Sequence, residues 1–457
     1  MKYLSLFIGA GFPDESLEVA EGLEFDFIGA DAGSIDVGPC QLGGTGQLFS
    51  DDLCRRDLRH VLLLARRRGV PLLVGSSGGA GTDVGVDRFA RMVREIAEQE
   101  RLPRFRLALI YTEPDRDSLI KRVRAGLVTP LPGNTFGYDE DSVRRSSRIV
   151  SVIGAEPFQQ ALREGADVIL AGRTTDSAIF AALPLLKGIP AADAWHAGKV
   201  AECGGAVGQP SRSDLLLVQM SDGGFSVAPC APDAVCTAWS VSAHQLYENA
   251  DPFAFIEPSG VMDATEAQFD ETTDGSVHVS GAQFRASPRY TRKLEGVEPA
   301  GFQSITMGCY NDPVLLEDVD FWQAAMLEEV RKKIRRVYPD NFDDATISIQ
   351  RYGDGQGALM FDASHMADSG WTPRELFFLL SVNAPDQAMA NSICTVAWHT
   401  LIHFPPRGWK GSFVTAAWPF NPPVMDRGPV HRFNVNHVER VDDPSEGLRF
   451  HYEELGL

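Results

Sequence analysis

The chain has 457 residues, of which 44% are hydrophobic and 23% charged, and its formal net charge at pH 7 is −20. These values are typical of a globular protein with more than one hydrophobic core, and the acidic balance argues against binding of nucleic acid, which needs a basic surface. No apolar run approaches the roughly 18 residues of a membrane span, and seven scattered cysteines without a C-x-x-C pair indicate a reducing compartment, so we expect a cytoplasmic protein with no membrane contact.

Short apolar runs and helical patterns alternate over the first domain that we expect, residues 1–190. The expected strands are residues 3–8, 25–28, 70–74, 105–111, 149–153 and 168–171. The expected helices are residues 13–23, 51–68, 86–99, 116–125, 157–164 and 176–186. Such alternation predicts an α/β fold, with a doubly wound, mostly parallel sheet that has helices on both faces.

The pattern changes after a connection that we expect at residues 191–209, and a second lobe is expected over residues 210–457. Its expected strands are residues 215–220, 225–228, 277–283, 302–307, 346–351, 358–361, 412–417 and 432–438. Its two clear helices are expected at residues 318–337 and 386–402. Strands separated by turn signals, with helices set apart from them, predict an α+β lobe.

Three polar, glycine-rich loops follow expected strands of the first domain, at residues 29–47, 75–83 and 172–177. Glycines let backbone amides approach a ligand, and a helix N-terminus favours an anion. Because strand ends share one edge of an α/β sheet, the loops predict a common pocket for a small anionic substrate. The alternative is that these glycines only permit tight turns, since the second loop has neither Walker nor dinucleotide-binding spacing. The substrate-binding candidates are Ser34, Ser76, Ser77, Gly78, Gly79, Gly81, Thr174 and Thr175.

Acidic residues and one arginine are the catalytic candidates of these loops. Asp31, Asp36 and Asp176 could serve as general acid and base. Arg173 could hold a substrate carboxylate or phosphate, or could instead form a salt bridge with a neighbouring aspartate. Asp31 and Asp83 are candidate ligands of Mg²⁺, which prefers oxygen atoms, and no other cofactor is indicated. For Asp83 and Asp176, helix N-capping is the alternative role.

Candidates outside these loops have weaker patterns. Cys203 could be a nucleophile, but two glycines follow it directly, and this pattern is more typical of the C-terminal end of a helix. His399 and His403 could share one helix face, although no H-E-x-x-H motif is present. Further polar candidates in the second lobe are Asp312, Asp354, Arg407, Trp409 and Lys410.

Four segments together resemble a known family. They are GADVILAGRTTDSAIF at 165–180, AGKVAECGG at 197–205, the GSSGGAG loop at 75–81 and FNVNHVERVDDP at 433–444. The chain resembles the acyclic terpene utilisation AtuA-like family, whose members typically show a G-A-D-x-x-x-x-G-R-x-T-D-x-A core followed by an E-C-G stretch. The matching residues here are Gly165, Ala166, Asp167, Gly172, Arg173, Thr175, Asp176 and Ala178, then Glu202, Cys203 and Gly204.

The resemblance implies an enzyme of catabolic operons with a small companion subunit, and we expect a homo-oligomer. From this family context we expect a lyase of the hydratase type that acts on a small unsaturated or hydroxylated carboxylate or its CoA thioester. Arg173 and the loop at 75–81 would anchor the anion, and Asp31 or Asp36 would work with Asp176 as the acid–base pair. Backbone amides or Mg²⁺ would stabilise an enolate-like charge. The alternatives are a hydrolase or transferase with the same anion-binding loops, or a non-catalytic binding subunit that requires the companion.

Overall fold

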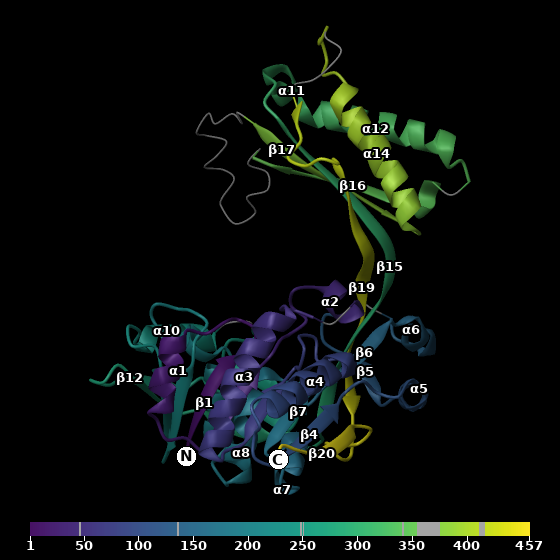
Figure 1. The fold of residues 1–457 in the computed structure, drawn as a ribbon. Coiled ribbons are helices and arrows are strands. Elements are labelled where there is room, and N and C mark those ends of the chain that lie inside the picture. Colours follow the sequence, from purple (N-terminus) through teal and green to yellow (C-terminus); the bar gives the residue numbers. More distant parts are fainter. Residues whose placement is uncertain are drawn as a thin grey trace. The chain divides into compact units, whose positions relative to one another are not determined.

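The computed structural model shows two compact units (Figure 1). The first unit comprises Met1–Glu298 and Phe433–Leu457, and the second comprises Pro299–Arg432. This division differs from the expected one, because strands that follow residue 210 extend the sheet of the first unit. The structure describes residues 1–44, 47–134, 137–246, 249, 251–340, 342–353, 375–410 and 416–457.

A ten-stranded sheet forms the centre of the first unit, in the order β12-β13-β9-β8-β1-β2-β3-β7-β4-β20. Its parallel middle consists of β1 (Lys2–Phe7), β2 (Phe27–Asp31), β3 (Leu72–Gly75), β7 (Val168–Ala171) and β4 (Phe105–Tyr111). The antiparallel flanks are β8 (Leu216–Ser221), β9 (Gly224–Pro229), β13 (Val277–Ser280) and β12 (Gln268–Glu271) on one side and β20 (Arg449–Leu455) on the other. The α/β class is confirmed, whereas the sheet as a whole is mixed.

Helices pack against both faces of this sheet. Successive side chains of a strand point to opposite faces, so Leu4 and Leu6 join one hydrophobic cluster while Tyr3 joins another. The cluster of Leu4 includes α1 (Asp14–Glu21), α3 (Asp51–Arg68) and α4 (Asp83–Gln99). The cluster of Tyr3 includes α7 (Glu156–Arg163), α8 (Asp176–Leu186) and α9 (Ala191–Ala201).

Helix α8 packs directly onto two strand residues of the sheet that are glycines. A Cβ atom added to Gly29 would lie 2.6 Å from the ring of Phe180, and one added to Gly75 would lie 2.3 Å from Ile179. Both distances are far below van der Waals contact, so a larger residue would push α8 away. The glycines thus fix the N-terminus of α8 at the carboxyl edge of β2 and β3.

The remaining elements of the first unit lie outside the ten-stranded sheet. A three-stranded antiparallel sheet contains β10 (Ala254–Glu257), β11 (Gly260–Asp263) and β14 (Gln283–Ala286). The expected strand at 149–153 is β6 (Arg148–Val152), but it pairs with the start of β15 (Thr291–Tyr310) and not with the large sheet. The other elements are α2 (Pro39–Gly43), α5 (Arg116–Arg124), β5 (Val128–Pro130), α6 (Glu140–Arg145), η1 (Gly204–Val207), α10 (Ala238–Gln245) and the end of β19 (Val424–Arg440).

The second unit combines an antiparallel sheet with helices around a core that contains Trp322, Phe378 and Ile393. Its elements are the end of β15, α11 (Pro313–Glu317), α12 (Val319–Val337), η2 (Phe342–Asp344), β16 (Thr346–Tyr352), β17 (Leu376–Ala384), α14 (Gln387–His403), β18 (Ala416–Ala417) and the start of β19. The expected strand at 358–361, Asp354 and most of the expected strand at 412–417 lie outside the described residues. Within the described ranges, no helix combines the length and the apolar character that crossing a membrane requires.

Candidate active site

The three glycine-rich loops touch one another at the carboxyl edge of the parallel strands. A Cβ atom added to Gly33 in the first loop would lie 2.2 Å from the carbonyl oxygen of Gly79 in the second. A Cβ atom added to Gly81 would lie 2.4 Å from the backbone nitrogen of Arg173 in the third. Since only hydrogen fits at these positions, glycine here serves the close packing of loop on loop.

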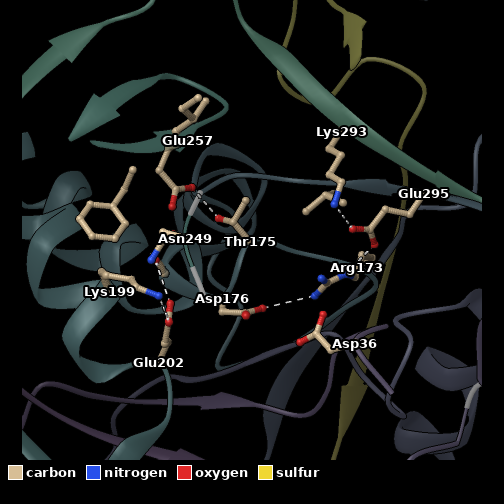
Figure 2. A pocket seen from close by; sticks show the side chains of 14 residues that line it. Asp36, Arg173, Thr175, Asp176, Lys199, Glu202, Asn249, Glu257, Lys293 and Glu295 are labelled. Carbon is tan, nitrogen blue, oxygen red and sulfur yellow. Dashed lines mark hydrogen bonds and ion pairs between the residues drawn. The ribbon is translucent and has the colours of Figure 1, made fainter. Parts of the chain in front are cut away.

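A cavity of about 420 Å³ opens beside the third loop, within the first unit (Figure 2). Three elements supply most of its polar side chains: the N-terminus of α8, the C-terminus of α9 and the start of β15. Such a volume suits a small-molecule ligand. The lining residues are Asp36, Val152, Arg173, Thr175, Asp176, Ser177, Lys199, Glu202, Asn249, Phe255, Ile256, Glu257, Lys293 and Glu295.

The structure brings together only some of the residues expected from the sequence. Asp36, Arg173, Thr175 and Asp176 line the cavity, and the hydroxyl group of Ser34 donates a hydrogen bond of 2.8 Å to Asp36. Other candidates are not among the residues that line it: Asp31, Ser76, Ser77, Gly78, Gly79, Gly81 and Thr174. Asp31, Ser76, Ser77 and Thr174 are instead buried beneath the loops.

Arg173 binds protein groups on several sides. Its Nε donates to Glu295 at 3.0 Å, and its Nη1 donates to the Ser76 hydroxyl at 3.1 Å and to Asp176 at 3.3 Å. Although burial opposes ionisation, the charges of Arg173 and Lys293 hold the pKa of Glu295 below its ordinary value. Arg173 thus forms the salt bridge that was the alternative to substrate binding, and it joins the second loop, α8 and β15.

Asp176 is the first residue of α8, and Thr175 is the N-cap, so the capping role that was the alternative for Asp176 is not seen. Burial raises the pKa of Asp176, with a further increase from Asp36, while Arg173 and Lys199 oppose the shift. Figure 2 shows its carboxyl group between Arg173 on one side and Lys199 on the other. The carboxyl group of Asp176 therefore binds a proton more tightly than that of an exposed aspartate, although two cations lie beside it.

Asp31 forms an acidic pair with Asp176. Its side chain at the end of β2 is only 3% exposed. Burial raises its pKa well above the ordinary value, the charge of Asp176 raises it further, and Arg173 opposes the shift. Because like charges at close range disfavour double ionisation, the pair retains a proton more readily than two separate aspartates would.

Glu257 is a cavity residue that the sequence did not reveal. It ends β10, it is 8% exposed, and it accepts a hydrogen bond of 2.6 Å from the hydroxyl group of Thr175. Burial raises its pKa to about 8, although the hydrogen bond from Thr175 lowers it. No local motif marks Glu257, because β10 reaches the cavity through its place in a separate sheet.

Glu202 and Lys199 form a second acid–base pair in the wall of the cavity. They lie at the C-terminal end of α9 and form an ion pair, and Ser177 donates a hydrogen bond of 3.3 Å to Glu202. Burial raises the pKa of Glu202 to about 7 against the opposing charge of Lys199. The E-C-G stretch was the available signal for Glu202, whereas nothing in the sequence pointed to Lys199 or to Lys293.

Asp83 has its own neighbours, away from Asp31. It lies in the first turn of α4, where Thr82, and not Asp83, is the N-cap, and it pairs with Arg449. Burial raises its pKa to about 6, and the next largest influence is the charge of Glu113. Among the described residues, Asp31 and Asp83 belong to no cluster of metal-ligating side chains. Magnesium binding therefore stays a prediction without a matching geometry.

The candidates of the second unit make structural contacts. Asp312 caps α11 by accepting hydrogen bonds of 2.9 and 3.2 Å from Val314 and Leu315. The rings of His399 and His403 pack together, with centroids 4.4 Å apart on α14. Arg407 lies 3.6 Å from the centroid of the Phe321 ring and pairs with Asp318.

A comparison with family models matches residues 43–421 to the acyclic terpene utilisation family protein AtuA. The matched range contains Arg173, Asp176 and Glu257, whereas Asp31 and Asp36 precede it. No curated protein and no solved structure matches the chain. Since the match covers most of the chain, the protein belongs to the acyclic terpene utilisation AtuA family, and the expected family is confirmed.

Proposed function

We propose that the cavity of about 420 Å³ is the active site of a hydratase-type lyase in a catabolic route. Its substrate would be a small hydroxylated or unsaturated carboxylate, or the CoA thioester of one. The observation that carries the proposal is the presence on one small cavity of two carboxyl groups with raised pKa values, those of the half-buried Asp176 and the buried Glu257. The name of the family, which refers to the use of acyclic terpenes, is consistent with an unsaturated acyl substrate.

Glu257 suits the role of general acid. With a pKa of about 8 its carboxyl group holds a proton at pH 7. During dehydration, that proton would pass to the hydroxyl group of the substrate, which leaves as water, and the reverse transfer would accompany hydration. A raised carboxyl pKa near the working pH is the property that general acid catalysis needs.

Asp176 suits the role of general base. Arg173 and Lys199 favour its carboxylate form, while burial makes that carboxylate more basic than an exposed one. It would take the proton from the carbon next to the substrate carboxyl or thioester group. The electron pair of that C–H bond would first remain as an enolate-like charge on the carbon and the adjoining carbonyl group. It would then form the double bond as the hydroxyl group, protonated by Glu257, leaves as water, so atoms and charges balance.

Two features of the cavity favour a negatively charged substrate. Lys293 pairs with Glu295 at 2.8 Å, and its side chain is 43% exposed at the cavity. The N-terminus of α8 also faces the cavity through Thr175, Asp176 and Ser177, and no side chain caps it because the Thr175 hydroxyl bonds to Glu257 instead. The positive end of a helix dipole stabilises an anion such as a carboxylate.

The test is turnover of a substrate panel by the purified full-length protein. The panel consists of straight and branched 3-hydroxy carboxylates, their α,β-unsaturated counterparts and the CoA thioesters of both, followed by the absorbance of the conjugated double bond. We expect turnover of at least one of them and a loss of at least ~100-fold in kcat for Glu257→Gln and Asp176→Asn, as is typical when a general acid or base is removed.

The matched control is Glu453→Gln, because Glu453 is a surface carboxylate whose partner is Arg94. This variant should retain the wild-type rate. Binding of panel members without turnover would contradict the lyase proposal and favour a binding subunit. Normal turnover by Glu257→Gln would contradict the assignment of Glu257 as the acid.

A further inference from the structure

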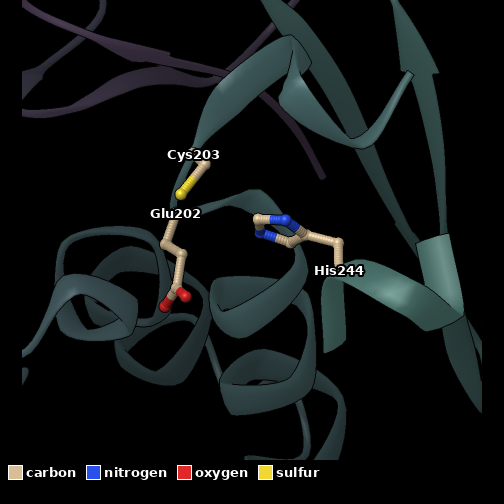
Figure 3. Close-up of side chains that lie close together, drawn as sticks. All are labelled: Glu202, Cys203 and His244. Atoms are coloured by element: carbon tan, nitrogen blue, oxygen red, sulfur yellow. The ribbon is translucent and has the colours of Figure 1, made fainter. Parts of the chain in front are cut away.

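We propose that Glu202, Cys203 and His244 form a binding site for a divalent transition-metal ion, and that Zn²⁺ is the ion that suits it. One ligand atom from each residue lies within 4.8 Å of the other two (Figure 3). This is the one such group of ligands among the described residues. The inference does not rest on the proposed function, because no step of the lyase reaction is assigned to Glu202, Cys203 or His244.

Two helix ends bring the three side chains together. Glu202 caps the C-terminus of α9, Cys203 follows it, and His244 lies in the last turn of α10. Directly after Cys203, Gly204 adopts φ +58°, and a Cβ atom there would lie 2.6 Å from the carbonyl oxygen of Asp214. Only glycine fits this turn, so the backbone holds Cys203 in place. In Figure 3 the imidazole of His244 extends from α10 toward Glu202 and Cys203.

The chemistry of the three ligands suits zinc. A thiolate, an imidazole and a carboxylate are the ligand types that Zn²⁺ takes in proteins, and the soft sulfur disfavours Mg²⁺ and Ca²⁺. Metal–ligand bonds of about 2.0–2.3 Å place the ligand atoms of a tetrahedral ion roughly 3.5 Å apart. Ligand atoms within 4.8 Å therefore need to approach by only about 1 Å or a little more, which side-chain rotation supplies.

Charge balance also favours the ion. With Cys203 as a thiolate and Glu202 as a carboxylate, the site would offer two negative charges to a divalent cation. Lys199 pairs with Glu202, and a partner of this kind orients a metal-binding carboxylate. Two negatively charged ligands reduce the repulsion between the metal ion and the ammonium group of Lys199, whereas neutral ligands would not.

A second cavity, of about 440 Å³, gives access to this group. Cys203 and His244 line it together with Gln209, Ser211 and Ser240. Glu202 lines the first cavity, so the proposed ion would lie in the wall between the two. Three protein ligands leave a fourth position open for water or a substrate atom, the arrangement of catalytic zinc sites.

The experiment uses full-length, tag-free protein that has been stripped of metal with a chelator and then titrated with Co²⁺. We expect thiolate-to-cobalt charge-transfer absorption that saturates at one equivalent and disappears when Zn²⁺ displaces Co²⁺. Cys203→Ser should abolish this absorption, and His244→Gln should weaken Co²⁺ binding by roughly 10-fold or more. The saturating band is measured on the wild-type protein, so this part of the test does not depend on whether a variant folds.

The matched control is Cys309→Ser, because Cys309 is also a thiol beside a carboxylate, 3.8 Å from Glu375 in the second unit. This variant should keep the full Co²⁺ band. A wild-type protein without the band, or a band that survives in Cys203→Ser, would overturn the proposal. Zn²⁺ should also raise the melting temperature of the wild type but not of Cys203→Ser, which gives a readout separate from activity.

Discussion

The hydroxyl group of Thr175 donates a hydrogen bond of 2.6 Å to Oε2 of Glu257. This bond joins the N-cap of α8, at the edge of the large sheet, to the last residue of β10 in the three-stranded sheet. It also takes the Thr175 side chain away from the helix cap that it would otherwise form. The bond therefore links the position of the proposed acid to the helix that carries the proposed base.

Thr175→Val should raise the pKa of Glu257, because the hydrogen bond from Thr175 lowers that pKa in the wild type. The expected increase is up to about one pKa unit, the value of one hydrogen bond. It would appear as a shift of the basic limb of the pH–rate profile to higher pH. Thr175→Ser keeps the hydroxyl group and should leave the limb in place; equal shifts in both variants would contradict the explanation.

Glu257 should make stability fall as the pH rises. Its pKa is about 8 in the folded protein against an ordinary 4.5, so the folded state holds a proton that the unfolded state has lost. Between these values the wild type should lose free energy of unfolding relative to Glu257→Gln, by up to a few kcal/mol, and the difference should level off on either side. Urea unfolding of both proteins at pH 5, 6.5 and 8 measures this; a constant difference would contradict the raised pKa.

Arg173→Ala should destabilise the fold as well as the site. Glu295 would lose the buried guanidinium group that it binds at 3.0 Å and keep only the partly exposed Lys293, 2.8 Å away. Removal of one partner of a buried pair costs about 3–5 kcal/mol, and the remaining cation places the expected loss toward the lower end of that range. Arg173→Ala combined with Glu295→Gln should recover part of that loss. Urea unfolding measures both.

The control for Arg173 is Arg94→Ala, which removes an exposed pair with Glu453. Such surface pairs are worth about 0–1 kcal/mol, so this variant should unfold almost like the wild type. Equal losses for Arg173→Ala and Arg94→Ala would contradict the bracing role of Arg173 between α8 and β15.

Gly81→Ala should separate the second and third loops. Gly81 and Gly126 have similar backbone angles, φ +63° and +67°, but a Cβ atom on Gly81 would lie 2.4 Å from Arg173 and one on Gly126 would meet nothing within 4 Å. Gly126→Ala should cost about 1–2 kcal/mol, the strain of a left-handed alanine. Gly81→Ala should cost more in the same unfolding measurement; equal costs would show that the loops tolerate separation.

Local patterns in the sequence predict part of this site. Apolar runs that end in glycine-rich loops predict Asp36, Arg173 and Asp176 at one sheet edge, because strand, loop and helix are consecutive in the chain, and all three residues line the cavity. Glu257 and Lys293 reach the cavity from β10 and β15, whose pairings join segments far apart in sequence. The pattern of hydrophobic residues along a strand does not show which distant strand it pairs with.

Strand pairing between distant segments also accounts for the differences between the expected and the observed fold. The apolar run at 149–153 forms a strand, but pairing with β15, rather than with the large sheet, depends on a partner more than a hundred residues away. Strands β8, β9 and β13 extend the first sheet and thereby move the boundary between the units to residue 298. Strand patterns predict that a segment is extended, not which neighbour it joins.

Deuterium incorporation in D₂O most directly tests whether Asp176 and Glu257 act as base and acid. With a substrate that the wild type turns over, NMR should show deuterium at the carbon next to the carboxyl or thioester group. Asp176→Asn should abolish this incorporation, whereas Glu257→Gln should retain it while blocking the loss of water, since each variant removes one proton transfer. Incorporation at the wild-type rate by Asp176→Asn would contradict the central claim.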